Sequence, residues 1–218
     1  HQGAPTSGRG GGLVTLIPPR EPIAIVRLDD LSASVELSRA LLAGGVGIVE
    51  FTLTNHKALD AVENVREHLG DHMIVGAGTV LDAESARSAI LAGAQFLVTP
   101  VLAPEVIDCG RRYGVPVMCG ALTPTEILSA WQAGADFIKV FPARTFGPAY
   151  IKDVLAPLPM LRLVPTGGVD AHNCRQYLEA GAYTVALGSN LVNPRKVSEG
   201  DWEGITRVAS QVVSACRD

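Results

Sequence analysis

Residues 133–142 read Ala-Gly-Ala-Asp-Phe-Ile-Lys-Val-Phe-Pro, and this stretch decides the fold. Glycine just past a helix end adopts the left-handed conformation that turns the chain, so Ala133-Gly134-Ala135 predicts the end of a helix. Phe137–Phe141 is a short run of strand-forming residues that stops at Pro142. The stretch therefore predicts a helix–turn–strand junction with one lysine, Lys139, inside the strand.

The same junction recurs along the chain, where Ala-Gly punctuation also stands at Gly44, Gly93 and Gly181. Short apolar runs predict strands that begin near Ile23, Gly47, Met73, Phe96, Val115, Phe137, Leu161 and Thr184. Amphipathic segments between them predict helices over Leu31–Ala43, Ala58–Leu69, Ala83–Leu91, Pro104–Tyr113, Pro124–Ala133 and Ala171–Ala180. Asp82, Thr123 and Asp170 stand where helix caps are expected.

Eight strand–helix units at nearly regular spacing predict one closed (β/α)₈ TIM barrel over residues 21–218. Residues 1–20, which open on a low-complexity run, are expected to be a flexible leader or a cloning remnant. A doubly wound open sheet is the alternative architecture. No GxGxxG follows the first strand, where Ile25–Asp29 runs on instead, and this favours the barrel.

Composition excludes several classes of function. The 218 residues are 47% hydrophobic with a net charge of −4, which predicts a sizeable core and no nucleic-acid partner. No apolar stretch is long enough for a membrane span. The four cysteines and five histidines show no metal-ligand spacing, so no metal site or disulfide framework is expected. These features predict a soluble, cytoplasmic protein with free thiols.

Lys139 and Glu50 are the candidate catalytic residues. Burying an ammonium group in an apolar strand disfavours its charged form, and a neutral amine attacks carbonyl compounds. The alternative for Lys139 is a solvated strand end or a pair with a carboxylate. Glu50 ends another apolar strand, where burial should raise its pKa and permit proton transfer near neutral pH. The alternative for Glu50 is a structural ion pair.

Chemistry in such barrels lies at the carboxyl ends of the strands. Arg27, Thr79, Pro100, Phe141, Thr166 and Ser189 fall at these ends and would face one cavity with Lys139 and Glu50. This set predicts a site that forms an imine. The hydroxyls of Thr79 and Ser189 would otherwise satisfy backbone groups, and Phe141 would otherwise be packing.

Glycines after the seventh and eighth strands predict a phosphate site. Gly167-Gly168 and Gly188-Ser189 would expose backbone N–H groups in adjacent loops, where barrels often bind phosphate. Each pair taken alone is an ordinary turn. Arg144 and Lys152 lie near in sequence and are expected to be surface charges.

As a set, these residues resemble 2-keto-3-deoxy-6-phosphogluconate (KDPG) aldolases and the related 4-hydroxy-2-oxoglutarate (KHG) aldolases. The resemblance covers residues 22–215 and rests on four motifs, which are Gly45 to Glu50, Gly76-Ala77-Gly78-Thr79-Val80, Phe137–Pro142 and Pro165-Thr166-Gly167-Gly168-Val169. It implies a metal-free, cofactor-free class I aldolase, a homotrimeric (β/α)₈ barrel that acts on a phosphorylated 2-keto acid.

The resemblance also implies roles for individual residues. Lys139 corresponds to the Schiff-base lysine and Glu50 to the acid/base. Thr79 and Pro100 match positions that line the pyruvate half, whereas Thr166, Gly167, Gly168 and Ser189 match the end that receives the sugar hydroxyls and phosphate. Some members carry an arginine four residues after the glutamate, where this chain has Thr54, and others carry it at the end of the first strand, where Arg27 stands.

Four alternatives to a gluconate-specific aldolase remain. The galactonate epimer and 4-hydroxy-2-oxoglutarate would be cleaved by the same mechanism, and Thr166 favours the gluco sugar because relatives that prefer the galacto sugar tend to lack this threonine. A sugar-phosphate epimerase barrel would use the same phosphate glycines but has no need for an imine-forming lysine. A non-catalytic binding barrel would have little reason to keep both Lys139 and Glu50.

Overall fold

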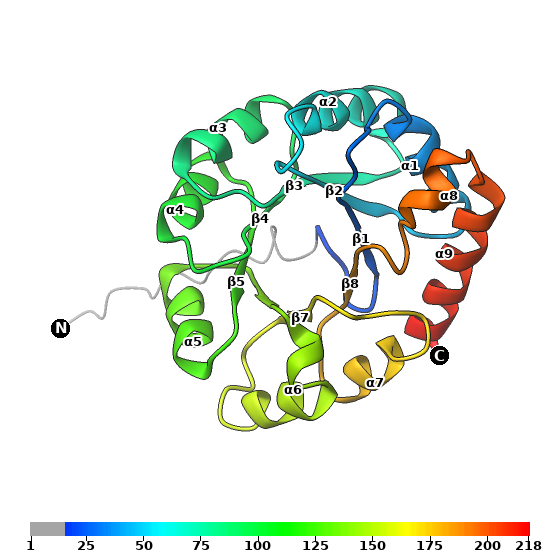
Figure 1. The fold of residues 1–218 in the computed structure, drawn as a ribbon. Helices are drawn as coiled ribbons and strands as arrows, with labels where there is room; N and C mark the ends of the chain where they lie inside the picture. Colours follow the sequence, from blue (N-terminus) through cyan, green and yellow to red (C-terminus); the bar gives the residue numbers. More distant parts are fainter. Residues whose placement is uncertain (1–15) are drawn as a thin grey trace.

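The structure, a computed structural model, describes residues 16–218 and confirms the (β/α)₈ barrel (Figure 1). Its eight strands pair in parallel in the order β7-β6-β5-β4-β3-β2-β1-β8. A parallel bridge between Thr166 and Ala186 joins the two ends of the sheet. The strands are β1 Ile23–Val26, β2 Ile48–Thr52, β3 Ile74–Gly78, β4 Leu97–Val98, β5 Val117–Ala121, β6 Phe137–Val140, β7 Leu163–Pro165 and β8 Ala186–Leu187.

Helices surround the strands, as Figure 1 shows. They are α1 Ser34–Ala43, α2 Ala58–Leu69, α3 Ala83–Leu91, α4 Pro104–Tyr113, α5 Pro124–Ala133, α6 Pro148–Leu155, α7 Cys174–Glu179, α8 Pro194–Ser198 and α9 Trp202–Arg217, with a short 3₁₀ turn η1 at Ala143–Thr145. Four of them, α2 to α5, have the bounds that the sequence predicts. No helix in residues 16–218 is long and apolar enough to cross a membrane.

Local signals explain these bounds. The Asp82 side chain accepts a hydrogen bond from Ser85 N–H at the start of α3, and Thr123 with Glu126 forms a capping box on α5. Three of the expected turn glycines adopt positive φ, at Gly93 (+101°), Gly134 (+105°) and Gly181 (+109°). At the first junction Gly44 stays helical with φ −84°, and the next residue, Gly45, takes the left-handed conformation (+96°).

Two predicted helices begin later than expected. The sequence places the start of α1 at Leu31, but Asp30 accepts a hydrogen bond from Ser32 N–H at 2.8 Å and holds this segment in a turn. The start of α7 is likewise predicted at Ala171. There the Asp170 side chain accepts hydrogen bonds from the N–H groups of His172 and Asn173, and the helix begins only at Cys174. Short polar side chains compete with the helix for backbone N–H groups in both places.

The apolar interior has two parts. One lies between the strands and the surrounding helices, and the other fills the amino-terminal half of the barrel. The second is made by Ile17, Ile23, Ile25, Ile48, Phe96, Val98, Met118, Phe137, Val164 and Ala186. Because this half is filled by side chains, the carboxyl ends of the strands are left for polar groups.

Ile17 belongs to the barrel interior although it precedes the first strand. Its side chain is 0% exposed, and its carbonyl accepts a hydrogen bond from the Tyr183 hydroxyl at 2.7 Å. The packed part of the chain therefore includes Ile17, four residues before the predicted barrel boundary at residue 21. Residues 1–15, the rest of the predicted leader, lie outside the described part of the chain.

Candidate active site

Side-chain alternation along the strands determines which residues face the barrel axis. Positions such as Ile48 on β2 and Phe137 on β6 pack in the interior cluster, so residues two further along each strand point the same way. Glu50 on β2 and Lys139 on β6 are those residues, and β2 and β6 stand four places apart in the ring of eight strands. The two side chains therefore point inward from opposite walls.

Lys139 and Glu50 are almost completely buried, with 3% and 2% of their surfaces exposed. Burial lowers the pKa of Lys139, the negative charge of Glu50 opposes this shift, and the positive charge of Arg27 adds to it. Burial raises the pKa of Glu50, and the charges of Lys139 and Arg27 act in the opposite direction. The environment thus favours the neutral form of each group, which suits a nucleophilic amine and a proton-transferring carboxyl.

Neither alternative for Lys139 describes its surroundings. A solvated strand end is inconsistent with its burial, and no ion pair found among residues 16–218 includes it. Its Nζ lies 5.0 Å from the centroid of the half-buried Phe141 ring, within the range of a cation–π contact. Phe141 therefore lies beside the amine of Lys139 and is only half-buried.

Glycines make room for this pair. A Cβ on Gly78 of β3 would lie 2.9 Å from both Cδ and Oε1 of Glu50, so the carboxyl group rests directly on this glycine. A Cβ on Gly120 of β5 would lie 2.3 Å from the carbonyl carbon of Pro100, which explains the close approach of the β4–α4 loop. Thr99 fixes that approach, since its hydroxyl accepts from Gly120 N–H and donates to the Val101 carbonyl.

Arg27 and Thr79 meet at the ends of β1 and β3. Arg27 Nη2 and Thr79 Oγ1 are 3.5 Å apart, a long contact at an exposed position. Thr79 has φ +54°, a left-handed conformation that costs a β-branched residue about 1–3 kcal/mol. Strain of this kind is concentrated at functional sites.

Thr54, whose position carries arginine in some relatives, is linked through Thr52 to the end of β1, where Arg27 stands. The Thr54 and Thr52 hydroxyls are 2.8 Å apart, and Thr52 Oγ1 donates to the Val26 carbonyl at 3.4 Å. The residue after Val26 is Arg27, and its charge reaches both Lys139 and Glu50. Thr52 is buried and lies two residues after Glu50 on β2, so its side chain points to the same side of the strand.

The two glycine loops have the backbone geometry of an anion site. Gly167 and Gly168 have φ of +98° and +77°. Their carbonyl groups accept hydrogen bonds from Arg144 N–H and Asn173 Nδ2, whereas their N–H groups make none within the described residues. No protein atom lies within 4 Å of a Cβ built on Gly188, so packing does not require glycine there. Ser189 beside it is exposed.

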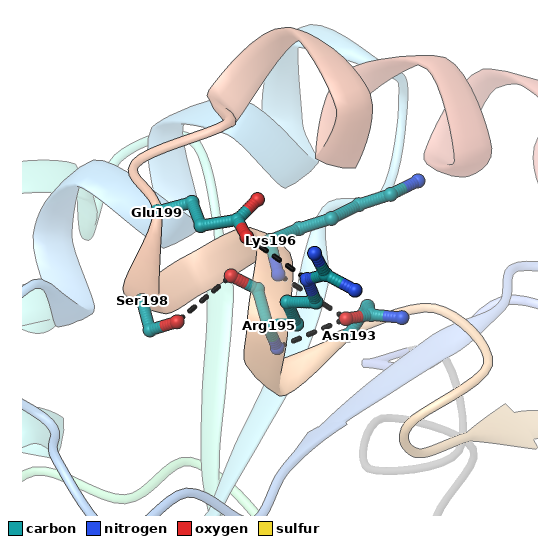
Figure 2. A network of polar contacts seen from close by, with 5 residues as sticks. All are labelled: Asn193, Arg195, Lys196, Ser198 and Glu199. Carbon is teal, nitrogen blue, oxygen red and sulfur yellow. Dashed lines mark hydrogen bonds and ion pairs between the residues drawn. The ribbon is translucent and has the colours of Figure 1, made fainter.

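Hydrogen bonds fix both loops from outside. Asn190 Nδ2 donates to the Val169 carbonyl at 3.0 Å and so links the β8–α8 loop to the β7–α7 loop. Figure 2 shows the anchor that follows, in which the Asn193 side chain accepts hydrogen bonds from the N–H groups of Arg195 and Lys196, and Arg195 pairs with Glu199 at 2.9 Å. Thr166 is buried and donates to the Val164 carbonyl at 3.2 Å.

Arg144 is exposed, as predicted for a surface charge, but it lies against the Gly167-Gly168 loop. The sequence predicts a surface charge here, and it is the pairing of β6 with β7 that brings Arg144 against Gly167. Among residues 16–218, no group of His, Cys, Asp and Glu is arranged to hold a metal ion.

A parallel eight-stranded barrel with a buried lysine and glutamate at the carboxyl ends of its strands has the architecture of a barrel enzyme. Residues 19–208 match the model of the KDPG and KHG aldolase family. The chain is 34% identical over 192 residues to the 2-dehydro-3-deoxy-phosphogluconate aldolase of Treponema pallidum, covering 88% of this chain and 91% of that one. It is 32% identical over 200 residues to the KHG/KDPG aldolase of Escherichia coli, covering 91% and 92%.

A solved structure agrees with these relatives. The KDPG aldolase of Legionella pneumophila, with pyruvate captured as a covalent carbinolamine intermediate, superimposes with a TM-score of 0.83 at 27% identity, covering 88% of this chain and 93% of that one. The chain belongs to the KDPG and KHG aldolase family, and it is a lyase of the aldolase type.

Proposed function

We propose that this protein is a class I aldolase that cleaves 2-keto-3-deoxy-6-phosphogluconate reversibly to pyruvate and glyceraldehyde 3-phosphate. The observation that carries the proposal is Lys139, a buried amine with a lowered pKa, which forms no ion pair within residues 16–218 and faces Glu50 across the barrel. Relatives named for this substrate and a related structure with a covalent pyruvate intermediate support it.

The chemistry follows from the two groups. Lys139 Nζ attacks the C2 ketone, the resulting carbinolamine loses water, and the protonated imine becomes an electron sink. Glu50, acting through a water molecule, takes the proton of the C4 hydroxyl. The C3–C4 bond breaks, its electrons form an enamine on Lys139, and glyceraldehyde 3-phosphate leaves. Protonation at C3 and hydrolysis of the imine then release pyruvate and the free amine.

The remaining predicted residues divide between the two ends of the substrate. Arg27, Thr79 and Pro100 would hold the pyruvyl half, with Phe141 against its methylene group. We expect the hydroxyls and the phosphate to be received by Thr166, Gly167, Gly168, Gly188 and Ser189. The N–H groups of Gly167 and Gly168, which make no hydrogen bond within residues 16–218, support this. The proposal needs no metal or cofactor.

Reductive trapping tests the proposal directly. Incubation with pyruvate and borohydride should add one pyruvyl group, and peptide mass spectrometry should locate it on Lys139. Lys139→Ala should abolish both the adduct and the aldol cleavage, whereas replacement of the exposed Lys152 by alanine should change neither. An unmodified Lys139, or full activity in Lys139→Ala, would disprove the mechanism.

The same site accommodates 4-hydroxy-2-oxoglutarate as a second substrate. The relative from Escherichia coli is named for both activities, and the Lys139–Glu50–Arg27 half of the site is independent of a phosphate group. The galactonate epimer is a further candidate. Comparison of kcat/KM for the three substrates ranks them, and we expect the phosphorylated gluconate to rank first.

We also propose a homotrimer that works in the cytoplasm. Large apolar side chains are exposed on the third and fourth strand–helix units, namely Leu81, Leu91, Val101, Leu102 and Tyr113, and a second copy would cover them. All four cysteines are free thiols, as expected in a reducing compartment. Light scattering should give three times the chain mass, and Val101→Glu should reduce it; a monomeric wild-type protein would contradict the proposal.

A further inference from the structure

Arg144 is fixed to the β7–α7 loop through its backbone. It lies in η1, directly after β6, and its N–H donates to the Gly167 carbonyl at 3.1 Å. The preceding residue, Ala143, donates to the Thr166 carbonyl at 2.8 Å and accepts from the buried Tyr177 hydroxyl at 3.3 Å. Two hydrogen bonds therefore hold this turn against the β7–α7 loop, and the third joins it to α7.

The side chain of Arg144 lies across Gly168. A Cβ on Gly168 would be 2.7 Å from Arg144 Cβ and 3.3 Å from its Nε. The stem of the arginine therefore occupies the space that any other residue at 168 would need. The Arg144 side chain therefore starts beside the Gly167-Gly168 loop. The N–H groups of these two glycines meet no protein acceptor within residues 16–218.

The charge of Arg144 is uncompensated. Some exposed arginines of the described chain pair with carboxylates, as Arg111 does with Asp108 and Arg195 with Glu199. Others, namely Arg39, Arg112 and Arg207, form no ion pair within residues 16–218. Arg144 has no such partner among the ion pairs of residues 16–218. An unpaired guanidinium beside unpaired N–H groups is suited to a phosphate dianion, since its planar donors bind two oxygens at once.

We propose that Arg144 is a specificity residue that binds the terminal phosphate of the substrate together with the Gly167-Gly168 loop. This inference rests on the proposed function and adds to it the side chain that distinguishes phosphorylated from unphosphorylated aldehydes. Because the phosphate is remote from the C3–C4 bond, the contact is the same in substrate and transition state. Its loss therefore appears in KM rather than in kcat.

The condensation direction isolates the phosphate. Pyruvate is condensed with D-glyceraldehyde 3-phosphate or with D-glyceraldehyde, two aldehydes that differ only in the phosphate. We expect Arg144→Ala to lower kcat/KM for the phosphorylated aldehyde on the order of 10-fold through KM, while the value for glyceraldehyde changes less than about 2-fold. Arg144→Lys should recover part of the loss. Higher ionic strength should reduce the difference between wild type and Arg144→Ala, because the guanidinium is exposed.

Lys152→Ala is the matched control, since it removes the same charge from an exposed position on α6 of the same strand–helix unit. It should leave both aldehydes unaffected. A preference for the phosphorylated aldehyde that survives Arg144→Ala would overturn this inference alone. Equal losses of kcat/KM for both aldehydes would also overturn it. If the wild-type enzyme itself showed no preference for the phosphorylated aldehyde, both the phosphate subsite and the role of Arg144 would be disproved.

Discussion

At the scale of single residues, the charges of Lys139 and Glu50 each shift the pKa of the other group. Burial pushes both towards their neutral forms, and the charge of each partner pulls the other back. The pKa of each group therefore depends on how far the charge of its partner offsets the effect of burial in the barrel. Changing one residue should therefore alter the titration of the other.

Glu50→Gln should lower turnover by about 10²–10⁴-fold, the usual contribution of a positioned acid or base. It should also lower the pKa of Lys139 further, because the negative charge of Glu50 is the one influence that raises it. Lys139 would then be neutral from a lower pH upward. A pulse of acetic anhydride at each pH, followed by peptide mass spectrometry, measures the neutral amine without help from Glu50.

Glu105→Gln, which removes an exposed carboxylate from α4, is the control and should leave the titration of Lys139 unchanged. The pH at which half of Lys139 is neutral should fall in Glu50→Gln. If it stays the same or rises, the two charges do not interact in this way.

Gly78→Ala tests whether the position of the Glu50 carboxyl group matters apart from its presence. The new methyl group would lie 2.9 Å from Glu50 Cδ and Oε1, so the carboxyl group has to move. We expect a folded protein with at least a 10-fold loss of turnover, since misplacement of about 1 Å is costly to catalysis. Pyruvate trapping on Lys139 should persist.

Gly47→Ala is the matched control, because its Cβ would meet only the His72 carbonyl oxygen at 3.8 Å, an ordinary contact. If both variants lost turnover to a similar degree, the loss would come from a general disturbance of the strands and not from displacement of the Glu50 carboxyl group.

At the scale of elements, the alternation of each strand explains which site residues could be predicted. Glu50, Lys139, Arg27 and Thr166 share the parity of apolar residues in the barrel interior, so a correct strand assignment already places them inside. Four helices had their predicted bounds because prolines, caps and glycines within a few residues determine them. Such local signals are fully present in the sequence.

Features that depend on contacts between distant segments could not be predicted in this way. The strain at Thr79 and the approach of Arg144 to Gly168 arise from how neighbouring loops pack. The helices α6, α8 and α9 were not singled out, and α8 is only five residues long. The late starts of α1 and α7 have a local cause instead, because aspartate side chains accept hydrogen bonds from nearby N–H groups and hold turns where the apolar pattern predicts a helix.

The turn at the end of β3 offers a test of strain against function. Thr79→Gly should raise stability on the order of 1 kcal/mol, because the release of left-handed strain exceeds the entropy cost of glycine. Activity should fall, since the hydroxyl beside Arg27 is lost. Urea denaturation and steady-state kinetics measure the two effects, and Thr79→Ser, which keeps the hydroxyl, should retain more activity than Thr79→Gly. A less stable glycine variant would show that Thr79 is not strained.

At the scale of the whole molecule, the barrel separates stability from chemistry along its axis. The amino-terminal half is filled by isoleucine, phenylalanine and other apolar side chains, while the charged and glycine-rich positions lie at the carboxyl ends of the strands.

Ile17→Ala tests this division. The side chain is fully buried in the amino-terminal half, so its truncation should destabilise the protein by about 2–5 kcal/mol, as for other large-to-small core changes. At a temperature where the variant stays folded, kcat and KM should match the wild-type values, because Lys139 and Glu50 lie at the other end of the strands. Tyr183→Phe, which removes the hydrogen bond to the Ile17 carbonyl, should destabilise by only about 1 kcal/mol. Urea midpoints and kinetics at the same temperature provide both readouts. If folded Ile17→Ala lost activity in proportion to its stability, the two halves of the barrel would be coupled, and the amino-terminal half would have to be counted as part of the catalytic apparatus.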